Sequence, residues 1–162
     1  PIGAIATKGA EGMDCSPRGD GPGFVTILDD QTLAIPDRRG NNRLDTLRNI
    51  VEDPRVALLF LIPGWNECLR VNGRAIVTAN EDLRARFERN GVLPATVVVI
   101  TIETMYFQCA RALKRAELWS AESHVKKGEL PSTGTLIQSA VTEFDGKAYD
   151  EGLEERQMKT LY

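Results

Sequence analysis

The sequence predicts a mainly β protein, an antiparallel barrel with peripheral helices. The first two-thirds of the 162 residues consist of short apolar segments separated by turn residues. These segments lack the intervening helices that a parallel sheet needs, so antiparallel pairing is the economical arrangement. The composition, with 42% hydrophobic and 27% charged residues, is ordinary for a globular domain, which excludes long disorder and a simple coiled coil.

Three hairpins are expected along the chain. Their paired segments are Ile2–Thr7 with Met13–Gly19, Phe24–Leu28 with Thr32–Pro36, and Val56–Ile62 with Leu69–Val77. Glycine, proline, aspartate or asparagine residues lie between the members of each pair and favour tight turns. Val97–Phe107 is long and rich in β-branched residues, so we expect it to be a central strand.

Two helices are expected to interrupt the strands. The first is indicated by apolar residues at helical spacing: Leu44, Leu47, Ile50 and Val51. Just before it, Asn42 and Asp45 resemble a capping box in which aspartate replaces glutamate. The second helix is expected over about residues 81–90, capped by Asn80 and stopped by Gly91.

The composition changes after Trp119. Residues 1–120 are expected to form the barrel domain, whereas residues 121–162 are mostly polar, with only weak apolar spacing. We expect this C-terminal extension to contain one or two short helices and to pack on the barrel or on a partner subunit. Because Pro1 stands within strand sequence, we expect the natural chain to begin earlier.

Charge and composition exclude several functions. The net charge of −3 gives no bulk positive field for nucleic acid, and the apolar segments are too short to span a membrane. Three widely spaced cysteines cannot form a disulfide framework, which indicates a reducing, cytoplasmic compartment. The single histidine, His124, gives no basis for a metal site and argues against most histidine-based catalysis.

The least ordinary segment lies directly before the first predicted helix. Arg38, Arg39 and Arg43 stand beside a helix N-terminus that already carries partial positive charge. A dianion held by guanidinium groups and backbone N–H donors would explain this placement, and Thr46 could add a hydroxyl. The alternative is a solvated basic loop in which Asn42 only caps the helix.

A second candidate segment precedes it in the sequence. Strand alternation puts Asp14, Ser16, Arg18 and Asp20 on one face, where Ser16 and Arg18 could hold a phosphate or a carboxylate. A surface charge ladder is the alternative interpretation. Pro17 removes a ladder hydrogen bond, so this stretch should be an edge or a bulge.

A third segment follows the long strand. Cys109 could be a nucleophile, but no histidine lies nearby in the sequence to activate it, so a buried, inert cysteine is the favoured interpretation. Lys114 and Arg115 could neutralise an anion or simply be exposed helix charges. The sequence offers no constrained catalytic residue.

Together these segments resemble the pyridoxamine 5′-phosphate oxidase-like, FMN-binding split-barrel family, and in particular a bacterial branch of probable FMN-dependent enzymes. The resemblance covers about residues 1–120. It is carried by Ile5-Ala6-Thr7 through Ser16-Pro17-Arg18-Gly19-Asp20, Ile35-Pro36-Asp37-Arg38, Asn42-Arg43-Leu44-Asp45-Thr46-Leu47-Arg48-Asn49-Ile50, Leu69-Arg70-Val71-Asn72-Gly73 and Cys109-Ala110-Arg111-Ala112-Leu113.

The resemblance implies a six-stranded split β-barrel that forms a homodimer, with FMN at the subunit interface. It implies four groups of cofactor-binding residues. The strand with Ser16, Pro17, Arg18 and Gly19 would hold the phosphate through Ser16 and Arg18, together with the loop that carries Asn42, Arg43 and Thr46. The other two groups are Ile35 and Pro36 beside the ring, and Cys109, Arg111 and Trp119 near the flavin or the partner.

The function implied is an FMN-dependent oxidoreductase acting on a small organic substrate. The alternatives are a non-catalytic flavin- or haem-binding sensor on the same fold and a deazaflavin-dependent reductase. The ending Gln157–Tyr162 lacks the Arg/His substrate motif of true pyridoxamine phosphate oxidases, which argues against that particular activity. Gln108 stands where the related branch often has a histidine.

Overall fold

The computed structural model describes residues 2–126 and 128–161. Contacts divide the chain into two compact units, Pro1–Trp119 and Ser120–Tyr162. The first unit contains all the strands, and the second is helical.

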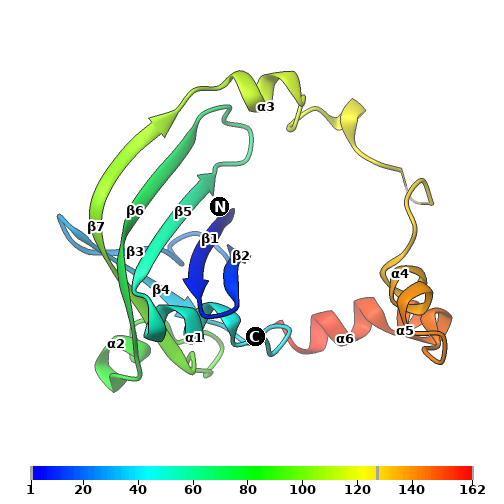
Figure 1. The fold of residues 1–162 in the computed structure, drawn as a ribbon, viewed down its shortest axis with the longest axis horizontal. Coiled ribbons are helices and arrows are strands. Elements are labelled where there is room, and N and C mark those ends of the chain that lie inside the picture. The colour runs from blue at the N-terminus through cyan, green and yellow to red at the C-terminus, as the bar shows by residue number, and fades with distance from the viewer. Residues whose placement is uncertain (1, 127, 162) are drawn as a thin grey trace. The chain divides into compact units, whose positions relative to one another are not determined.

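Seven antiparallel strands form a single sheet in the first unit (Figure 1). They are β1 (Ile2–Gly9), β2 (Gly12–Gly19), β3 (Thr26–Asp29), β4 (Thr32–Asp37), β5 (Arg55–Leu61), β6 (Cys68–Thr78) and β7 (Thr96–Gln108). Their order across the sheet is β2-β1-β5-β6-β7-β4-β3. The predicted mainly β, antiparallel fold is confirmed, with one strand more than the family resemblance implies.

The three predicted hairpins are present. β1 pairs with β2, β3 with β4, and β5 with β6, and in each pair the two antiparallel strands are consecutive in the sequence. The expected central position of β7 is also confirmed, because it pairs with β6 on one side and with β4 on the other.

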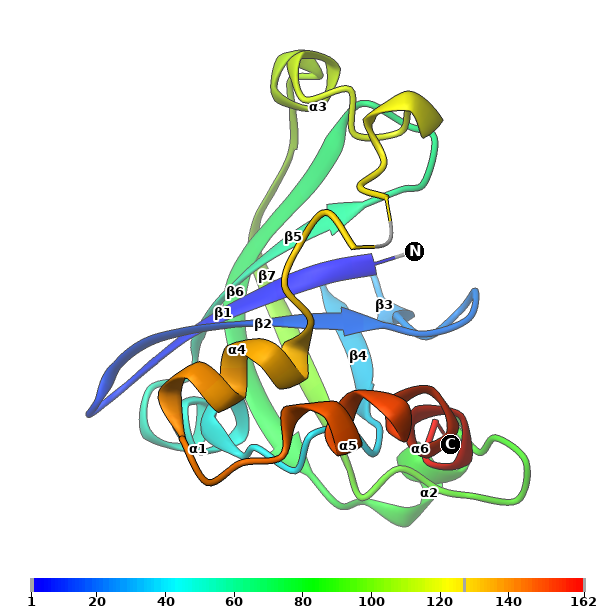
Figure 2. The same ribbon diagram turned by 90° about the vertical axis from the view of Figure 1, so that its right-hand side faces the viewer.

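The sheet is rolled into an incomplete barrel. Asp20 follows β2 and Arg38 follows β4, yet the Arg38 guanidinium lies 3.0 Å from the Asp20 carboxylate. These strands are five places apart in the sheet order, and in a flat sheet about 24 Å would separate them. Curling therefore brings them together, as Figure 2 shows for β1, β2 and β4. β2 and β3 are the two edge strands, and in the described residues they do not pair with each other, so the barrel is split.

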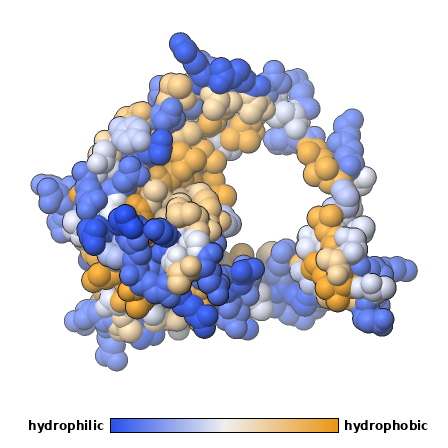
Figure 3. Space-filling view, viewed as in Figure 1, coloured by the Kyte–Doolittle hydropathy of each residue, from blue (hydrophilic) through white to orange (hydrophobic). Residues whose placement is uncertain are grey.

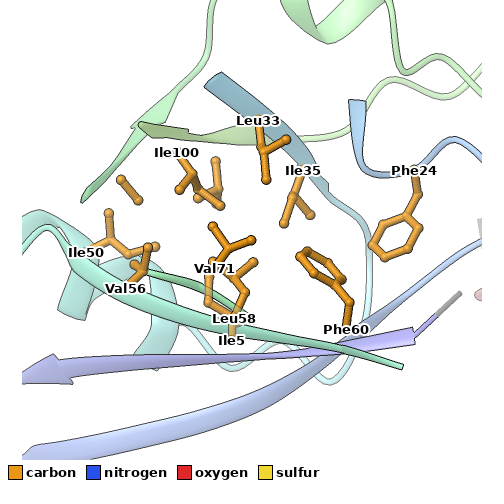
Figure 4. Close-up of a cluster of buried hydrophobic side chains, with 12 residues drawn as sticks. Ile5, Phe24, Leu33, Ile35, Ile50, Val56, Leu58, Phe60, Val71 and Ile100 are labelled. Atoms are coloured by element: carbon orange, nitrogen blue, oxygen red, sulfur yellow. The ribbon is translucent and has the colours of Figure 1, made fainter. Parts of the chain in front are cut away.

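The core lies on the inner face of this curled sheet. Alternate residues of each strand point inward, as in β5, where Val56, Leu58 and Phe60 are buried and Leu59 is exposed. Figure 4 shows the inward side chains meeting between the strands. The buried cluster contains Ile5, Phe24, Leu33, Ile35, Ile50, Val56, Leu58, Phe60, Val71, Ala75, Val98 and Ile100.

The first predicted helix is α1 (Asp45–Glu52), which packs Ile50 into the core. The predicted cap is wrong. Leu44 is the N-cap residue, and Asn42 lies outside the helix with a left-handed φ of 63°. Within α1, Thr46 and Ile50 are the buried residues, whereas Val51 is 77% exposed.

The second predicted helix, α2 (Glu81–Ala85), is shorter than the expected residues 81–90. Its predicted cap is confirmed, because Asn80 accepts a hydrogen bond from the Leu83 backbone at 2.9 Å. The helix ends early because Phe87 turns into a small apolar cluster and residues 89–92 form a tight turn around Gly91. A further short helix, α3 (Arg111–Arg115), follows β7.

The second unit contains more helix than expected. After the turn η1 (Ala121–Ser123), it has α4 (Thr133–Ala140), α5 (Gly146–Glu151) and α6 (Leu153–Lys159). Asp150 joins the first two, accepting hydrogen bonds from Ser132 Oγ and from the Gly134 backbone at 2.5 and 2.8 Å. α4 and α5 are held by side-chain caps and by close contacts at Gly134 and Gly146, not by a stripe of apolar residues. The spacing of apolar residues in the sequence therefore indicated these helices only weakly. No helix in the described parts of the chain is long and apolar enough to cross a membrane.

Candidate functional site

The inner face of β2 carries the polar residues of the candidate site. Asp14, Ser16 and Arg18 are half-buried, whereas Cys15 and Pro17 between them are exposed. The register pairs the three inward residues with Thr7, Ile5 and Gly3 of β1, in that order. β2 is an edge strand, as the proline predicts. The predicted alternation therefore holds for Asp14, Ser16 and Arg18, whose side chains turn towards the interior of the curled sheet, whereas Asp20 lies past the end of β2.

Asp14 connects this strand to α1. Ser16 Oγ and Thr46 Oγ1 both donate hydrogen bonds to Asp14 Oδ2, each at 3.0 Å. Thr46 is buried, with 3% of its surface exposed. Asn49, one turn further along α1, donates to Thr7 Oγ1 at 3.1 Å. Two segments about 30 residues apart in the sequence thus meet through hydroxyl groups.

The start of α1 is electropositive. Its N-cap residue makes no side-chain hydrogen bond to the first turn. The Asp45 carboxylate accepts one from its own backbone N–H, and the other N–H groups of that turn have no partner within the helix. Arg43 lies just before the helix and donates from Nε to Asp45 at 2.7 Å. That hydrogen bond lowers the pKa of Asp45 and raises that of Arg43, and the charge of Asp14 adds a smaller increase to the latter. Arg43 is mostly exposed, so its guanidinium can reach a ligand.

Arg18 lies near a second carboxylate, at the end of β4. Burial raises the pKa of Asp37, while the charge of Arg18 and a hydrogen bond from Thr96 oppose the increase. Arg18 also donates from Nη1 to the Pro17 carbonyl at 2.8 Å. Arg18 is therefore half-buried, and its charge acts on Asp37.

Arg38, one of the three arginines expected to hold a dianion before α1, has a different role. It binds Asp20, and Arg89 binds the other oxygen of the same carboxylate at 2.6 Å. The Asp20 side chain is only 4% exposed. The ion-pair group of Asp20, Arg38 and Arg89 therefore ties the end of β2 to the segment after β4, and it corrects the assignment of Arg38 to a bound dianion.

An apolar floor lies beside these polar groups. The register places Arg18, Gly3, Phe60, Leu69 and Phe107 in one row across β2, β1, β5, β6 and β7. A Cβ atom on Gly3 would lie 2.9 Å from the Phe60 ring, so the glycine makes room for that ring. Phe60 is 9% exposed, but Phe107 at the far end of the row is 71% exposed. The inner face thus changes from polar at β2 to apolar and open at β7.

The structure buries or separates the remaining predicted residues. Ile35 and Pro36 are buried within β4, and Ile35 belongs to the core. Arg111 begins α3, which lies at the opposite end of the sheet from α1 (Figure 1). Trp119 Nε1 donates to the Trp65 carbonyl at 2.7 Å in the same region. Within one chain, Arg111 and Trp119 therefore lie away from the group around Asp14.

The cysteines also differ from expectation. Cys109 is exposed, so its assignment as a buried residue is wrong, whereas Cys68 is the buried cysteine. β7 extends past the covered part of the core, and Cys109 follows its end. All three cysteines are free thiols. In residues 2–126 and 128–161, no group of three or more Cys, His, Asp or Glu side chains is placed to hold a metal ion.

Apolar side chains remain exposed near the same end of the sheet. Figure 3 shows them gathered over the ends of β5 and β7 and the segment leading to α3. Met105 is 59% exposed and Trp65 is 55% exposed. Exposed apolar side chains gathered in one place are typical of an interaction site.

Comparisons with known proteins agree with the split-barrel fold. The family model described as pyridoxamine 5′-phosphate oxidase matches residues 1–109. A crystal structure of a single-residue variant of HupZ from Group A Streptococcus matches with a TM-score of 0.55 at 18% identity, over 66% of this chain and 89% of that one. A second HupZ structure gives 0.54 at 18% identity, over 65% and 83%.

General stress protein 26 from Bacillus anthracis is more distant, with a TM-score of 0.47 at 17% identity, over 65% of this chain and 82% of that one. No curated protein matches the sequence significantly. At these identities the solved structures bear on the fold alone.

Proposed function

The chain belongs to the pyridoxamine 5′-phosphate oxidase family, and from this premise we propose that it binds FMN and acts as an FMN-dependent oxidoreductase on a small organic substrate. Family membership supports flavin binding in general. The choice of FMN is supported by one observation: the Ser16 and Thr46 hydroxyls meet beside Arg43 and the uncapped start of α1.

These groups suit a phosphate. Hydroxyl and backbone N–H donors, an exposed guanidinium and the positive end of a helix each favour a bound anion. Arg18 on the same inner face adds a second cation. Asp14, Asp45 and, beside Arg18, Asp37 oppose them, while Arg48 on α1 adds a third arginine. The residues present therefore fit the group, with Ser16, Arg18, Arg43 and Thr46 at its phosphate.

A flavin supplies hydride or electron transfer when it is bound, and the protein supplies position and electrostatics. In this proposal the four residues named above bind and orient the phosphate rather than act as acid or base. Phe60 and Leu69 provide an apolar surface next to the polar edge, which suits a flat ring and excludes water.

We also propose that the chain acts as a homodimer with the flavin at the subunit interface. Cys109, Arg111 and Trp119 lie away from the Asp14 group within one chain, so a second copy would have to supply them. The exposed Met105 and Phe107 give that copy an apolar surface to cover. Asn42, exposed before α1, would lie at the phosphate side of the same interface.

An absorbance spectrum of the freshly purified full chain and an FMN titration test the proposal. Arg43→Ala should weaken FMN binding by about 1.5–3 kcal/mol, or roughly 10- to 140-fold, because one charge-assisted contact is lost. Arg74→Ala removes an exposed arginine from β6 and serves as the control. Unchanged FMN affinity in Arg43→Ala would contradict the phosphate assignment. FMN binding without flavin reduction by a reduced nicotinamide would favour a non-catalytic binding protein.

A further inference from the structure

The carboxylate of Asp14 lies between the two hydroxyls of the proposed phosphate site. Ser16 Oγ and Thr46 Oγ1 each donate to the same oxygen, Asp14 Oδ2. A serine or threonine hydroxyl has one proton to donate. A phosphate bound between these two side chains would need those same protons, so it would compete with Asp14 for them.

The surroundings of Thr46 strengthen this competition. Its side chain is buried, so water is a poor alternative partner for its hydroxyl. Asp14 is half-buried on the inner face, and its charge also acts on Arg43. A dianion at this place would therefore displace Asp14 from both hydroxyls, share Arg43 with it and be repelled by its charge.

We propose that Asp14 determines the charge specificity of the site by weakening the binding of a phosphate dianion relative to an uncharged ligand with the same ring. This inference rests on the proposed FMN site. A flavin without a phosphate leaves the hydrogen bonds of Asp14 in place and meets no repulsion from it. Asp14 thereby lets the phosphate-bearing flavin dissociate more readily and reduces the difference in affinity between it and the phosphate-free form.

The test compares FMN with riboflavin, which lacks the phosphate, by fluorescence titration of the full chain. In Asp14→Asn we expect FMN to bind about tenfold more tightly or better, because the repelling charge is gone and the new amide can donate. Riboflavin binding should change by less than about twofold, because no dianion is involved. Asp30→Asn is the matched control, since it removes an exposed aspartate at the β3–β4 turn.

Two outcomes would overturn the inference. Weaker FMN binding in Asp14→Asn, as in Ser16→Ala, would mean that Asp14 positions the hydroxyls for the ligand. An equal change for both flavins would mean that it acts on something other than the phosphate. If Asp14→Asn does not fold, Asp14→Ser provides the same comparison, because its hydroxyl accepts a hydrogen bond without a charge.

Failure of the proposed function gives a different result. In that case, Ser16→Ala and Arg43→Ala would leave the ratio of FMN to riboflavin affinity unchanged. Absence of flavin binding by both the natural chain and Asp14→Asn would overturn the proposed function and the inference together.

Discussion

Replacing Asp20 by alanine removes the carboxylate that two arginines share. Its side chain is 4% exposed, while those of Arg38 and Arg89 are 21% and 40% exposed. Breaking a fully buried pair costs about 3–5 kcal/mol, but solvent reaches both arginines here, so we expect a loss of about 2–3 kcal/mol in the free energy of unfolding. For a unit of this size, that loss corresponds to a decrease in Tm of about 8–12 °C.

The assay is thermal and urea unfolding of the full chain, followed by circular dichroism. Asp30→Ala, an exposed aspartate in the β3–β4 turn, is the control and should change stability by less than about 0.5 kcal/mol. Asp20→Ala should cost less in an Arg89→Ala background, because one ion pair is already gone there. A loss below about 0.5 kcal/mol, or an equal loss in both backgrounds, would refute the reasoning.

Three other substitutions test separate parts of the structure. Gly3→Ala should destabilise the fold by about 1–3 kcal/mol in urea unfolding, because its methyl group meets the Phe60 ring, whereas Gly40→Ala, with no atom within 4 Å, should not. Burial raises the pKa of Asp37 above 3.8, so the folded chain binds its proton more tightly and stability falls as pH rises through the folded pKa. As the pH rises from 3 to 7, the free energy of unfolding of Asp37→Asn should therefore increase relative to that of the natural chain. A difference that stays constant over this range would contradict this. Phe107→Asp should shift sedimentation from dimer to monomer while circular dichroism shows the same secondary structure, since the side chain is 71% exposed in the single chain, and a persistent dimer would contradict the proposed interface.

Local patterns were enough to predict most of the fold. Each hairpin is set by alternating residues and by turn residues a few positions away, which are all visible in the sequence. The face shared by Asp14, Ser16 and Arg18 followed from the same alternation. The exposure of Cys109 at the end of β7 could not be predicted in this way, because it depends on how far the rest of the sheet extends beside that strand.

The sequence did not predict which charged residues pair with one another. Asp20 binds arginines that are 18 and 69 positions away in the sequence, and only the curl of the sheet brings them together. The capping-box pattern also predicted that Asn42 is a helix cap, but its left-handed backbone places it outside the helix. Charge pattern indicates that a segment is unusual, whereas the three-dimensional fold decides which cations are already paired.

The proposed site depends on a turn that supplies none of its ligand-binding residues. Gly9 pairs with Gly12, so two residues connect β1 to β2, and Gly12 adopts a φ of 116° that favours glycine. This turn fixes the register, and a slip of one residue would replace Ser16 and its inward neighbours with the residues that now face outward. The Ala10 backbone also donates to Glu52 at the end of α1, at 2.8 Å. The turn and the helix are thus held together, which keeps the hydroxyls of Ser16 and Thr46 on one carboxylate.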